Sequence, residues 1–395
     1  MQMITRISLI PFDIGGSNIS IHRNSLEAEG FTESRLQDMD KRLIGLDVSR
    51  WESNDDGINI TLYLERRGFG VLVYRESTEA RFGDHSSIAD LLEQRWQFHN
   101  EVIQGTSSIS KKVDALRMRV RKEFGCTTRW DSWEKVLYVF TFYVAEEDPD
   151  QILDDRDSQL GIIALSEPSR VGLGDTEEYL QDNFVVNWPI LSRISGLDPI
   201  DMPHDIETNK GVFCGVTWAS LIIACRSNHL DSTVNIYELL EVRTQIIWSL
   251  AHQIRRWCER QLAYNNIVEL SELNEVRGQV IPLLYEARQI SEASLSTRHA
   301  NILETLKHAS GLEHEIEAAE NALQLTYEFA EAIKVRRAKR YETAVKVLLG
   351  VIAVFQLTAL IHDGPLLSLS TLAATAILVG VGAATTFLVV RDHGE

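Results

Sequence analysis

The sequence lacks the features that mark exported and disulfide-rich proteins. Its 395 residues include only eight prolines and four cysteines, and no two cysteines lie at Cys-x-x-Cys or zinc-site spacing. We therefore expect reduced, mostly buried thiols in a cytosolic compartment. The N-terminus has no apolar run of the kind found in signal peptides, and Pro11 comes early. We expect the folded part of the chain to remain inside the cell.

Signatures of enzymes are also missing. The sequence contains no G-x-x-x-x-G-K-[ST], G-x-S-x-G or H-E-x-x-H motif. Its histidines are scattered: His252 stands among apolar neighbours, and the spacing of His308 and His314 does not place them on one helical face. We therefore predict that the protein is not an enzyme.

Positive charge is scarce in most of the chain. Residues 1–330 carry 52 acidic and 32 basic side chains, a net charge of −20, whereas residues 331–395 carry 7 basic and 5 acidic ones. Affinity for nucleic acid rests mainly on Lys and Arg that neutralise phosphates. We therefore expect no nucleic-acid partner, and an acidic domain suits cations better.

Mixed strand and helix patterns fill the first 230 residues. Residues 58–64 alternate between apolar and polar, and with the following 69–74 they predict a strand hairpin. The same reasoning predicts strands at 136–144, 160–165 and 218–225, and helices at 87–103 and 108–123, the first with Ser87 and Asp90 at capping-box spacing. We predict a cytoplasmic α+β domain over 1–230.

From residue 231 to 340 the pattern becomes helical. Apolar residues predict one long amphipathic helix over 233–263 and a second over 267–294, which contains Pro282. Between Ile302 and Ile333 they recur in steps of three and four, as in a helix packed along a seam. No proline interrupts the chain between Ser294 and the apolar C-terminal segments. If this helix is unbroken as far as Ile361, it forms a stalk about 95 Å long.

Two apolar segments, 344–361 and 366–390, occupy the C-terminal region, 341–395. A bilayer core needs about 20 residues of helix, so we predict a two-helix transmembrane hairpin rather than the alternative, a buried hairpin in a soluble core. Positive charge before the first segment predicts that both termini are cytoplasmic in the cell inner membrane. The outer loop would be His362, Asp363, Gly364 and Pro365, and the flanking basic residues are Arg336, Arg337, Lys339 and Arg340.

One stripe of the first apolar segment combines apolar and polar residues. Polar side chains inside a membrane span are candidates for function, and in a symmetric oligomer this stripe would line a central pore, with a ring of Asp363 attracting cations at its outer mouth. Alternatively, Gln356 forms a hydrogen bond with a neighbouring helix, and Asp363 is simply hydrated. The predicted pore-lining residues are Leu349, Ile352, Gln356, Ala359 and Asp363.

Seven carboxylates gather within twelve residues after the predicted strand 136–144. Oxygen-rich clusters suit hard cations such as Mg²⁺ or Ca²⁺, which makes a regulatory metal site one interpretation. A solvated loop is the other, and Glu313, Glu315, Glu317 and Glu320 on the stalk were similarly expected to be exposed. The candidate metal ligands are Glu146, Glu147, Asp148, Asp150, Asp154, Asp155 and Asp157.

The order of these parts resembles the CorA-like divalent cation (magnesium) transporters, which have a cytoplasmic α/β domain, a long stalk helix continuing into the first span, a short outer loop and a second span. The resemblance implies a pentamer, a pore lined by the first span, gating by the cytoplasmic domain, and Mg²⁺ as transported or regulatory ion. The family carries Gly-Met-Asn at the outer end of the first span. Here that place holds Ala359-Leu360-Ile361-His362-Asp363-Gly364, so no residue of that signature carries over.

Two other classes of function remain open at this point. The chain is alternatively a signal-activated membrane effector or sensor, as in bacterial defence, whose hairpin permeabilises or anchors to the bilayer. It is alternatively a plain tail-anchored scaffold. Ion selectivity separates the transporter from the effector, and absence of conductance would leave the scaffold.

Overall fold

The computed structural model describes residues 3–13, 19–55, 58–65, 69–124, 139–166, 204–205, 212–217, 220–263, 273–274, 278, 281, 284, 295–362 and 380. Two compact units divide the chain. The first comprises Met1–Cys258 and Gln279–Ala322, and the second comprises Glu259–Gly278 and Leu323–Glu395.

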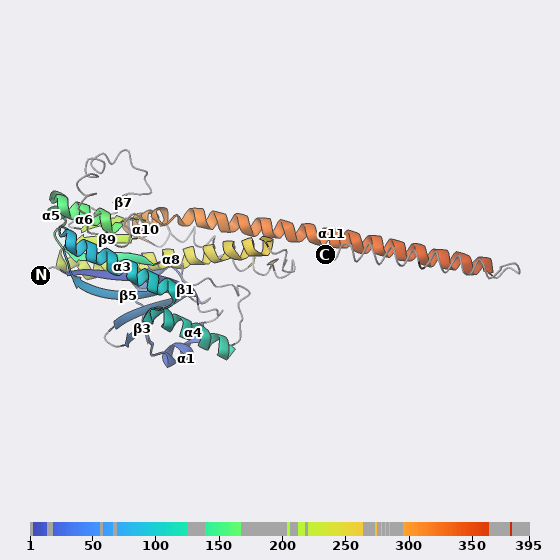
Figure 1. Ribbon diagram of the computed structural model, residues 1–395, viewed down its shortest axis with the longest axis horizontal. Coiled ribbons are helices and arrows are strands. Elements are labelled where there is room, and N and C mark those ends of the chain that lie inside the picture. The colour runs from blue at the N-terminus through green and yellow to red at the C-terminus, as the bar shows by residue number, and fades with distance from the viewer. Residues whose placement is uncertain are drawn as a thin grey trace. The chain divides into compact units, whose positions relative to one another are not determined.

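A nine-stranded sheet organises the first unit, in the order β2-β3-β4-β5-β1-β6-β9-β8-β7 (Figure 1). Among the described strands, all neighbouring pairs are antiparallel except β6 and β9, which are parallel. The strands are β1 (Met3–Asp13), β2 (Thr32–Ser34), β3 (Val48–Asp55), β4 (Ile58–Glu65), β5 (Phe69–Glu79), β6 (Phe140–Glu146), β7 (His204–Asp205), β8 (Val212–Val216) and β9 (Ser220–Cys225).

Helices flank this sheet and continue beyond it. They are α1 (Ile19–Ala28), α2 (Asp38–Ile44), α3 (His85–Gln104), α4 (Ser108–Phe124), α5 (Pro149–Asp154), α6 (Arg156–Ser166), α8 (Ser227–Ala263), α10 (Thr297–Ala309) and α11 (Leu312–His362). The α+β domain and the long C-terminal helices expected from the sequence are therefore present.

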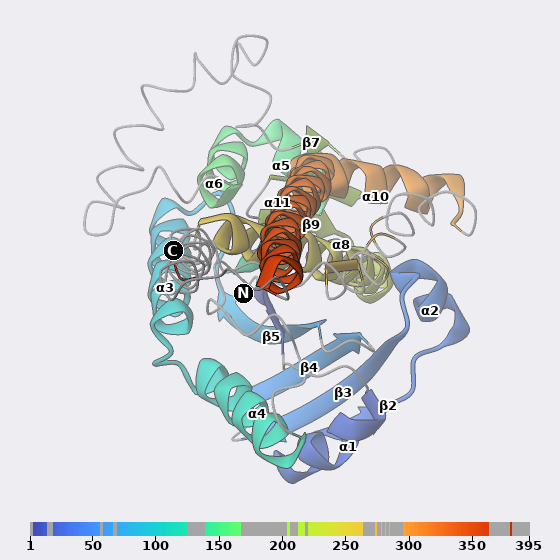
Figure 2. The ribbon, with the colours of Figure 1, turned by 90° about the vertical axis from the view of Figure 1, so that its right-hand side faces the viewer.

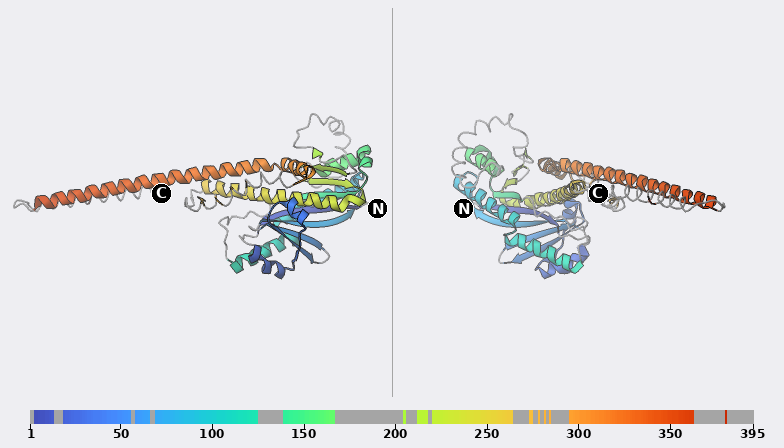
Figure 3. Two further views of the ribbon diagram at one scale, coloured as in Figure 1. Left: turned by 180° about the vertical axis from the view of Figure 1, so that it is seen from behind. Right: turned by 45° about the vertical axis from the view of Figure 1, so that its right-hand side comes forward.

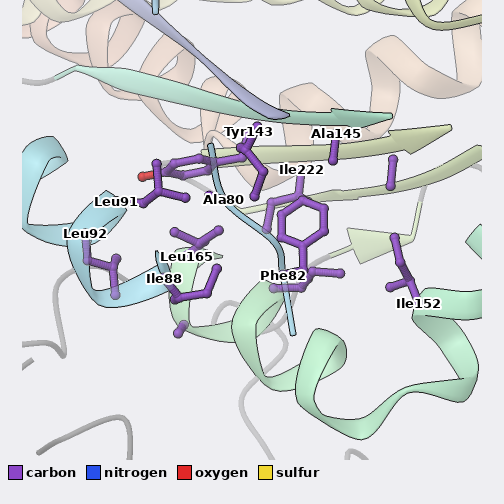
Figure 4. Close-up of a cluster of buried hydrophobic side chains, with 14 of the residues drawn as sticks. Ala80, Phe82, Ile88, Leu91, Leu92, Tyr143, Ala145, Ile152, Leu165 and Ile222 are labelled. Atoms are coloured by element: carbon purple, nitrogen blue, oxygen red, sulfur yellow. The ribbon is translucent and has the colours of Figure 1, made fainter. Parts of the chain in front are cut away.

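The first face of the sheet is covered by α3, α4 and α6 (Figure 2). Side chains of β6 and β9 pack there with α3, α5 and α6 in one apolar cluster, which includes Tyr143, Ile222 and Leu165 (Figure 4). A second cluster joins β3, β4 and β5 to α1 and α4, and includes Trp51, Leu62 and Leu72. Each cluster closes one end of the same face.

The opposite face of the sheet packs against α8, which runs along the strands (Figure 3). The Tyr63 hydroxyl of β4 donates to Glu238 Oε1 of α8 at 2.8 Å, and Arg75 Nη2 of β5 donates to Glu238 Oε2 at 2.5 Å. Cross-strand register places Val71 on the same face as Tyr63. The helix is buried around its whole circumference between Tyr237 and Ile247, so it is a core element of the first unit.

Several predicted elements are confirmed. The hairpin 58–64 and 69–74 is β4 and β5, the strand at 218–225 is β9, and the helices at 87–103 and 108–123 are α3 and α4. The helix expected at 233–263 is α8, and Cys214, Cys225 and Cys258 are buried free thiols. The capping prediction was wrong in detail, because Asp84 is the N-cap of α3 and accepts from the backbone N–H of Ser86.

Two predicted elements were wrong. Residues 160–165 form part of helix α6 and not a strand, since Asp155 accepts from the backbone N–H and the hydroxyl of Ser158 and so caps the helix start. The stalk is also not continuous from residue 294. It breaks between α10 and α11 at Ser310 and Gly311, whose positive φ of 63° ends the first helix.

The membrane hairpin falls largely outside the described residues. Helix α11 continues through the expected first span to His362, but side chains are described only as far as Val354. Asp363, Gly364, Pro365 and the second expected span, apart from Gly380, lie outside the described part, as does nearly all of 267–294. Among the helices that the structure describes, none has both the length and the apolar character needed to cross a bilayer.

Candidate functional site

The predicted acidic cluster lies at the end of β6 and along α5 and α6. Asp148 pairs with Arg226 Nη2 at 2.9 Å, and Asp157 Oδ1 lies 3.7 Å from His85 Nε2. Asp155 is committed to capping α6, and the Ser158 hydroxyl lowers the pKa of its carboxyl. Its members therefore serve different local partners.

The described carboxylates of this cluster do not converge on a common point. Glu146 ends β6 with its side chain exposed, while the side chains of Asp150 and Asp154 are outside the described set. Among the residues that the structure describes, no group of three His, Cys, Asp or Glu side chains is placed to hold a metal ion. The run also lies largely on helices α5 and α6 and not on the loop that the second interpretation expected.

Helix α11 changes character along its length. Its seam of Leu312, Ile316, Ala319, Leu323 and Ala330 is buried, as the steps of three and four predict. Beyond Ala330 the described side chains are nearly all exposed. They include the basic residues Arg336, Arg337, Lys339 and Arg340, and then Leu349 and Ile352 of the predicted pore stripe.

The exposed end of α11 is mostly apolar, and its charged residue, Lys346, pairs with Glu342 one turn earlier. Six large apolar side chains there are 37% to 58% exposed. Successive helical residues are turned by about 100°, so these six positions are spread around most of the helix instead of forming one seam. Apolar side chains spread in this way are typical of a fully buried or membrane environment. The six are Val345, Val347, Leu348, Leu349, Ile352 and Val354.

A polar stripe runs along α8 in the first unit, where the sequence predicts only an amphipathic helix. Its members recur in steps of three and four, so they share one side of the helix. Two of them bond to each other, because Gln245 Nε2 donates to Glu241 Oε1 at 2.5 Å. The stripe consists of Glu238, Glu241, Gln245, Trp248, His252 and Arg255.

Burial raises the pKa of Glu241 to about 8, and the hydrogen bond from Gln245 lowers it only in part. Glu241 is 1% exposed, so its carboxyl is protonated at neutral pH. Nearby in sequence, Arg243 is equally buried, and burial lowers its pKa to about 10. Within the described structure, Arg243 Nε and Nη1 have no hydrogen-bond partner.

The stripe ends in a cluster that ties α8 to the first turn of α11. Arg255 Nε donates to Glu315 Oε1 at 2.8 Å, and His252 Nδ1 lies 3.1 Å from the same oxygen. The His252 ring stacks on Trp248 with a centroid distance of 4.8 Å. The prediction that Glu315 is exposed was therefore wrong. His252 stands among apolar neighbours in sequence but has Glu315 and Trp248 as partners in the structure. Glu315 and the residues that donate to it lie about 60 residues apart in sequence, which no local pattern reveals.

Hydrogen bonds decide the charge state of Glu315. Burial raises the pKa of its carboxyl, but hydrogen bonds from His252 and Arg255 and the charge of Arg255 lower it by more, so that the net shift is downward. Glu313 and Glu317 are exposed, as predicted, whereas Glu320 is half-buried. Glu315 fixes α11 against α8 within the first unit.

Replacing Glu315 by Ala should lower the free energy of unfolding by about 3 kcal/mol at pH 7, because Arg255 and His252 would lose their acceptor. The folded pKa of Glu315 lies below its unfolded value, so its stabilisation is present above the unfolded pKa and disappears as the pH falls through the folded pKa. Urea unfolding of both proteins at pH 7 and pH 3.5 measures this difference. The exposed Glu317→Ala variant is the control, and equal losses in the two variants would contradict the assignment.

No family model, curated protein or solved structure matches the chain.

Proposed function

We propose that the chain is a membrane protein of the CorA-like type, a homo-oligomeric channel or transporter for cations with the α+β unit in the cytoplasm. The observation that carries this proposal is the end of α11, where six large apolar side chains are exposed around most of the helix and Lys346 is the charged residue among them. A partner helix in water would cover one seam, whereas hydrocarbon covers all sides. The sequence extends this apolar run to Ile361 and supplies a second one at 366–390.

The basic residues before the apolar end set the proposed orientation. Arg336, Arg337, Lys339 and Arg340 are exposed and lie within a few turns of Val345. Because such residues stay on the cytoplasmic side, the sheet unit is cytoplasmic and the loop at Asp363 faces outward. The same residues suit contact with anionic lipid headgroups.

One copy has two apolar segments, which cannot enclose an aqueous pore, so conduction requires an oligomer. The resemblance implies a pentamer lined by the stripe that contains Gln356 and Asp363. A ring of carboxylates at the outer mouth raises the local cation concentration on the order of ten-fold or more. In this arrangement the sheet unit acts on the pore through α11, which Glu315 holds against α8.

The test is cation flux into liposomes that contain the purified full-length protein, after its oligomeric mass has been determined. We expect a pentamer that passes Mg²⁺, and a loss of about ten-fold in flux for Asp363→Asn. Asp392→Asn, which changes a carboxylate in the tail, is the matched control and should leave flux unchanged. Flux that Asp363→Asn leaves intact would overturn the proposed pore, and an oligomer silent to all ions would overturn the channel.

A signal-activated effector is the second candidate, and one observation favours it. The sheet unit contains buried cationic donors without partners among the described residues, notably on Arg6, which suits a domain that binds a small ligand. In this case the hairpin would leak unselectively, and only after a cytosolic factor is added. Flux measured with and without a cytosolic extract, for Mg²⁺ and K⁺ in parallel, distinguishes the two.

A further inference from the structure

The two apolar clusters on the α3-covered face of the sheet are separated by polar side chains. Register places Arg6 of β1 directly opposite Tyr143 of β6, and Ser8 opposite Thr141. All four are at most 4% exposed. Arg95 of α3 lies above them, with its Cζ atom 6.0 Å from the centre of the Tyr143 ring. We call Arg6, Ser8, Arg95, Thr141 and Tyr143 the polar band.

The polar band is rich in positive charge. Arg6 Nη2 pairs at 2.5 Å with Glu76, whose side chain is 43% exposed at the rim. Arg95 Nη1 donates to the backbone oxygen of Leu165 at 3.1 Å, which is a neutral acceptor. Burial lowers the pKa of Arg95, Tyr143 raises it, and the charge of Arg6 lowers it again. Two buried guanidinium groups thus lie close enough for the charge of one to affect the pKa of the other.

Four polar atoms of the band are buried without a hydrogen-bond partner in the described structure. They are Arg6 Nε, Arg6 Nη1, Thr141 Oγ1 and the Tyr143 hydroxyl, and all come from the two neighbouring strands β1 and β6. Burial raises the pKa of Tyr143, and Arg95 lies close enough to its oxygen to lower that pKa in part, but the two side chains do not meet the geometry of a hydrogen bond, and the O–H of Tyr143 remains able to donate. In Figure 4 the Tyr143 hydroxyl is directed toward α3, beside Leu91. A buried polar group that lacks a partner is costly, so several in one place indicate a missing ligand.

The chemistry of these atoms defines the ligand. A guanidinium group has N–H donors and no acceptor, so Arg6 needs a partner that accepts, and the two hydroxyls are able to donate to the same partner. Arg6 also packs its Cζ atom 5.3 Å from the centre of the Phe98 ring, which holds the guanidinium in place by its flat face. Glu76 already balances the charge of Arg6 at Nη2, so what is missing is acceptors. An oxyanion presents several acceptor oxygens, enough for Arg6 Nε and Nη1 and the two hydroxyls together, and its hydrogen bonds with a guanidinium are charge-assisted.

We propose that the polar band binds a small oxyanion, the phosphate or carboxylate group of a small molecule, through Arg6, Tyr143 and Thr141. The rim of the band is the route of entry. There the Glu76 side chain is partly exposed, and Phe98 and His99 of α3 are half-buried. This site belongs to the sheet unit alone and does not depend on the channel proposed above.

The test is binding of inorganic phosphate and, in a second arm, of succinate to the purified full-length protein, measured by calorimetry with chloride as the only other anion. We expect saturable binding in at least one arm, and the tighter arm identifies the phosphate or the carboxylate. Arg6→Gln should weaken binding at least about ten-fold, because a charge-assisted hydrogen bond is lost. Arg226→Gln, which removes an exposed arginine, should leave the affinity unchanged.

Tyr143→Phe keeps the packed ring and removes only the hydroxyl, so it tests the site without unfolding the protein. Under the proposal its affinity for the anion falls about five-fold or more while the thermal midpoint without anion changes little. If neither anion binds at millimolar concentration, or if Tyr143→Phe and Arg6→Gln bind as tightly as the wild type, the proposal is overturned. In either of those cases the donors are satisfied by ordered water only.

Discussion

Replacing Glu241 by Gln is expected to raise the free energy of unfolding by about 3 kcal/mol at pH 7. The pKa of Glu241 is raised to about 8 in the folded protein, from 4.5. The unfolded chain therefore releases this proton at a lower pH than the folded one, and its contribution to stability, complete below pH 4.5, is lost as the pH rises toward 8. The Gln side chain introduced at position 241 keeps the oxygen that accepts the hydrogen bond from Gln245, and it has no titratable proton.

Urea unfolding at pH 5, 6, 7 and 8 measures this effect. The wild type should lose stability steadily over the range, and Glu241→Gln should remove most of that slope, so that the two proteins differ least at pH 5. The exposed Glu317→Gln variant is the control for removing a carboxylate from a helix. Parallel curves for the wild type and Glu241→Gln would show that the carboxyl is not protonated in the folded state.

Gly161→Ala is expected to destabilise the first unit by about 3 kcal/mol, although alanine is the better helix former. A Cβ atom at this position of α6 would lie 2.0 Å from the backbone oxygen of Phe82 and 3.1 Å from Ile88 Cγ1. The backbone at Phe82 cannot rotate out of the way as a side chain can, so α6 would have to move away from the sheet. This shift would also displace the Leu165 oxygen, which accepts from Arg95 and from Ser220.

Thermal unfolding followed by tryptophan fluorescence measures this loss. Gly278→Ala is the matched control, because Gly278 is also helical and a Cβ atom there meets nothing within 4 Å. That variant should be neutral or slightly stabilised, by less than about 1 kcal/mol. An equal midpoint for Gly161→Ala and the wild type would mean that α6 does not approach Phe82 as closely as described.

Sequence patterns predicted the elements that depend on local periodicity. The alternation in β4 and the three-and-four steps of α8 and α11 are strong signals, and the elements lie where those signals are. The short apolar run at 160–165 is ambiguous by nature, since a strand and one turn of buried helix look alike. There the cap at Asp155 decided the structure.

The first strand was not predicted from the sequence, and it contains a proline, Pro11, a residue that is rare inside paired strands. In the structure β1 pairs with β6 only from Ile4 to Leu9, whereas its pairing with β5 continues to Asp13. Pro11 therefore lies where only one neighbour is paired, and its missing N–H costs no bond to β6. The proline is tolerated because β6, which lies about 130 residues later in the chain, does not extend alongside Pro11.

The candidate sites were harder to predict for the same reason. The polar band needs β1, β6 and α3 in register, and the Glu315 cluster needs α8 beside α11. Nothing in the sequence distinguishes Arg6, Tyr143 or His252. In the structure, Arg6 and Tyr143 are distinguished by buried polar atoms without a hydrogen-bond partner, and His252 by the carboxylate of Glu315 that it shares with Arg255. The acidic run, by contrast, was conspicuous in sequence, but its described members are used for a helix cap and surface ion pairs.

The strand order affects how the chain folds as it leaves the ribosome. Because β1 lies between β5 and β6, the strands from β2 to β6 are able to pair once residue 146 has emerged. Their second face, with Leu9, Val73 and Phe140 side by side, has to wait for α8, which begins only at Ser227. During that interval an apolar sheet surface is exposed to water, which makes the nascent protein prone to aggregate.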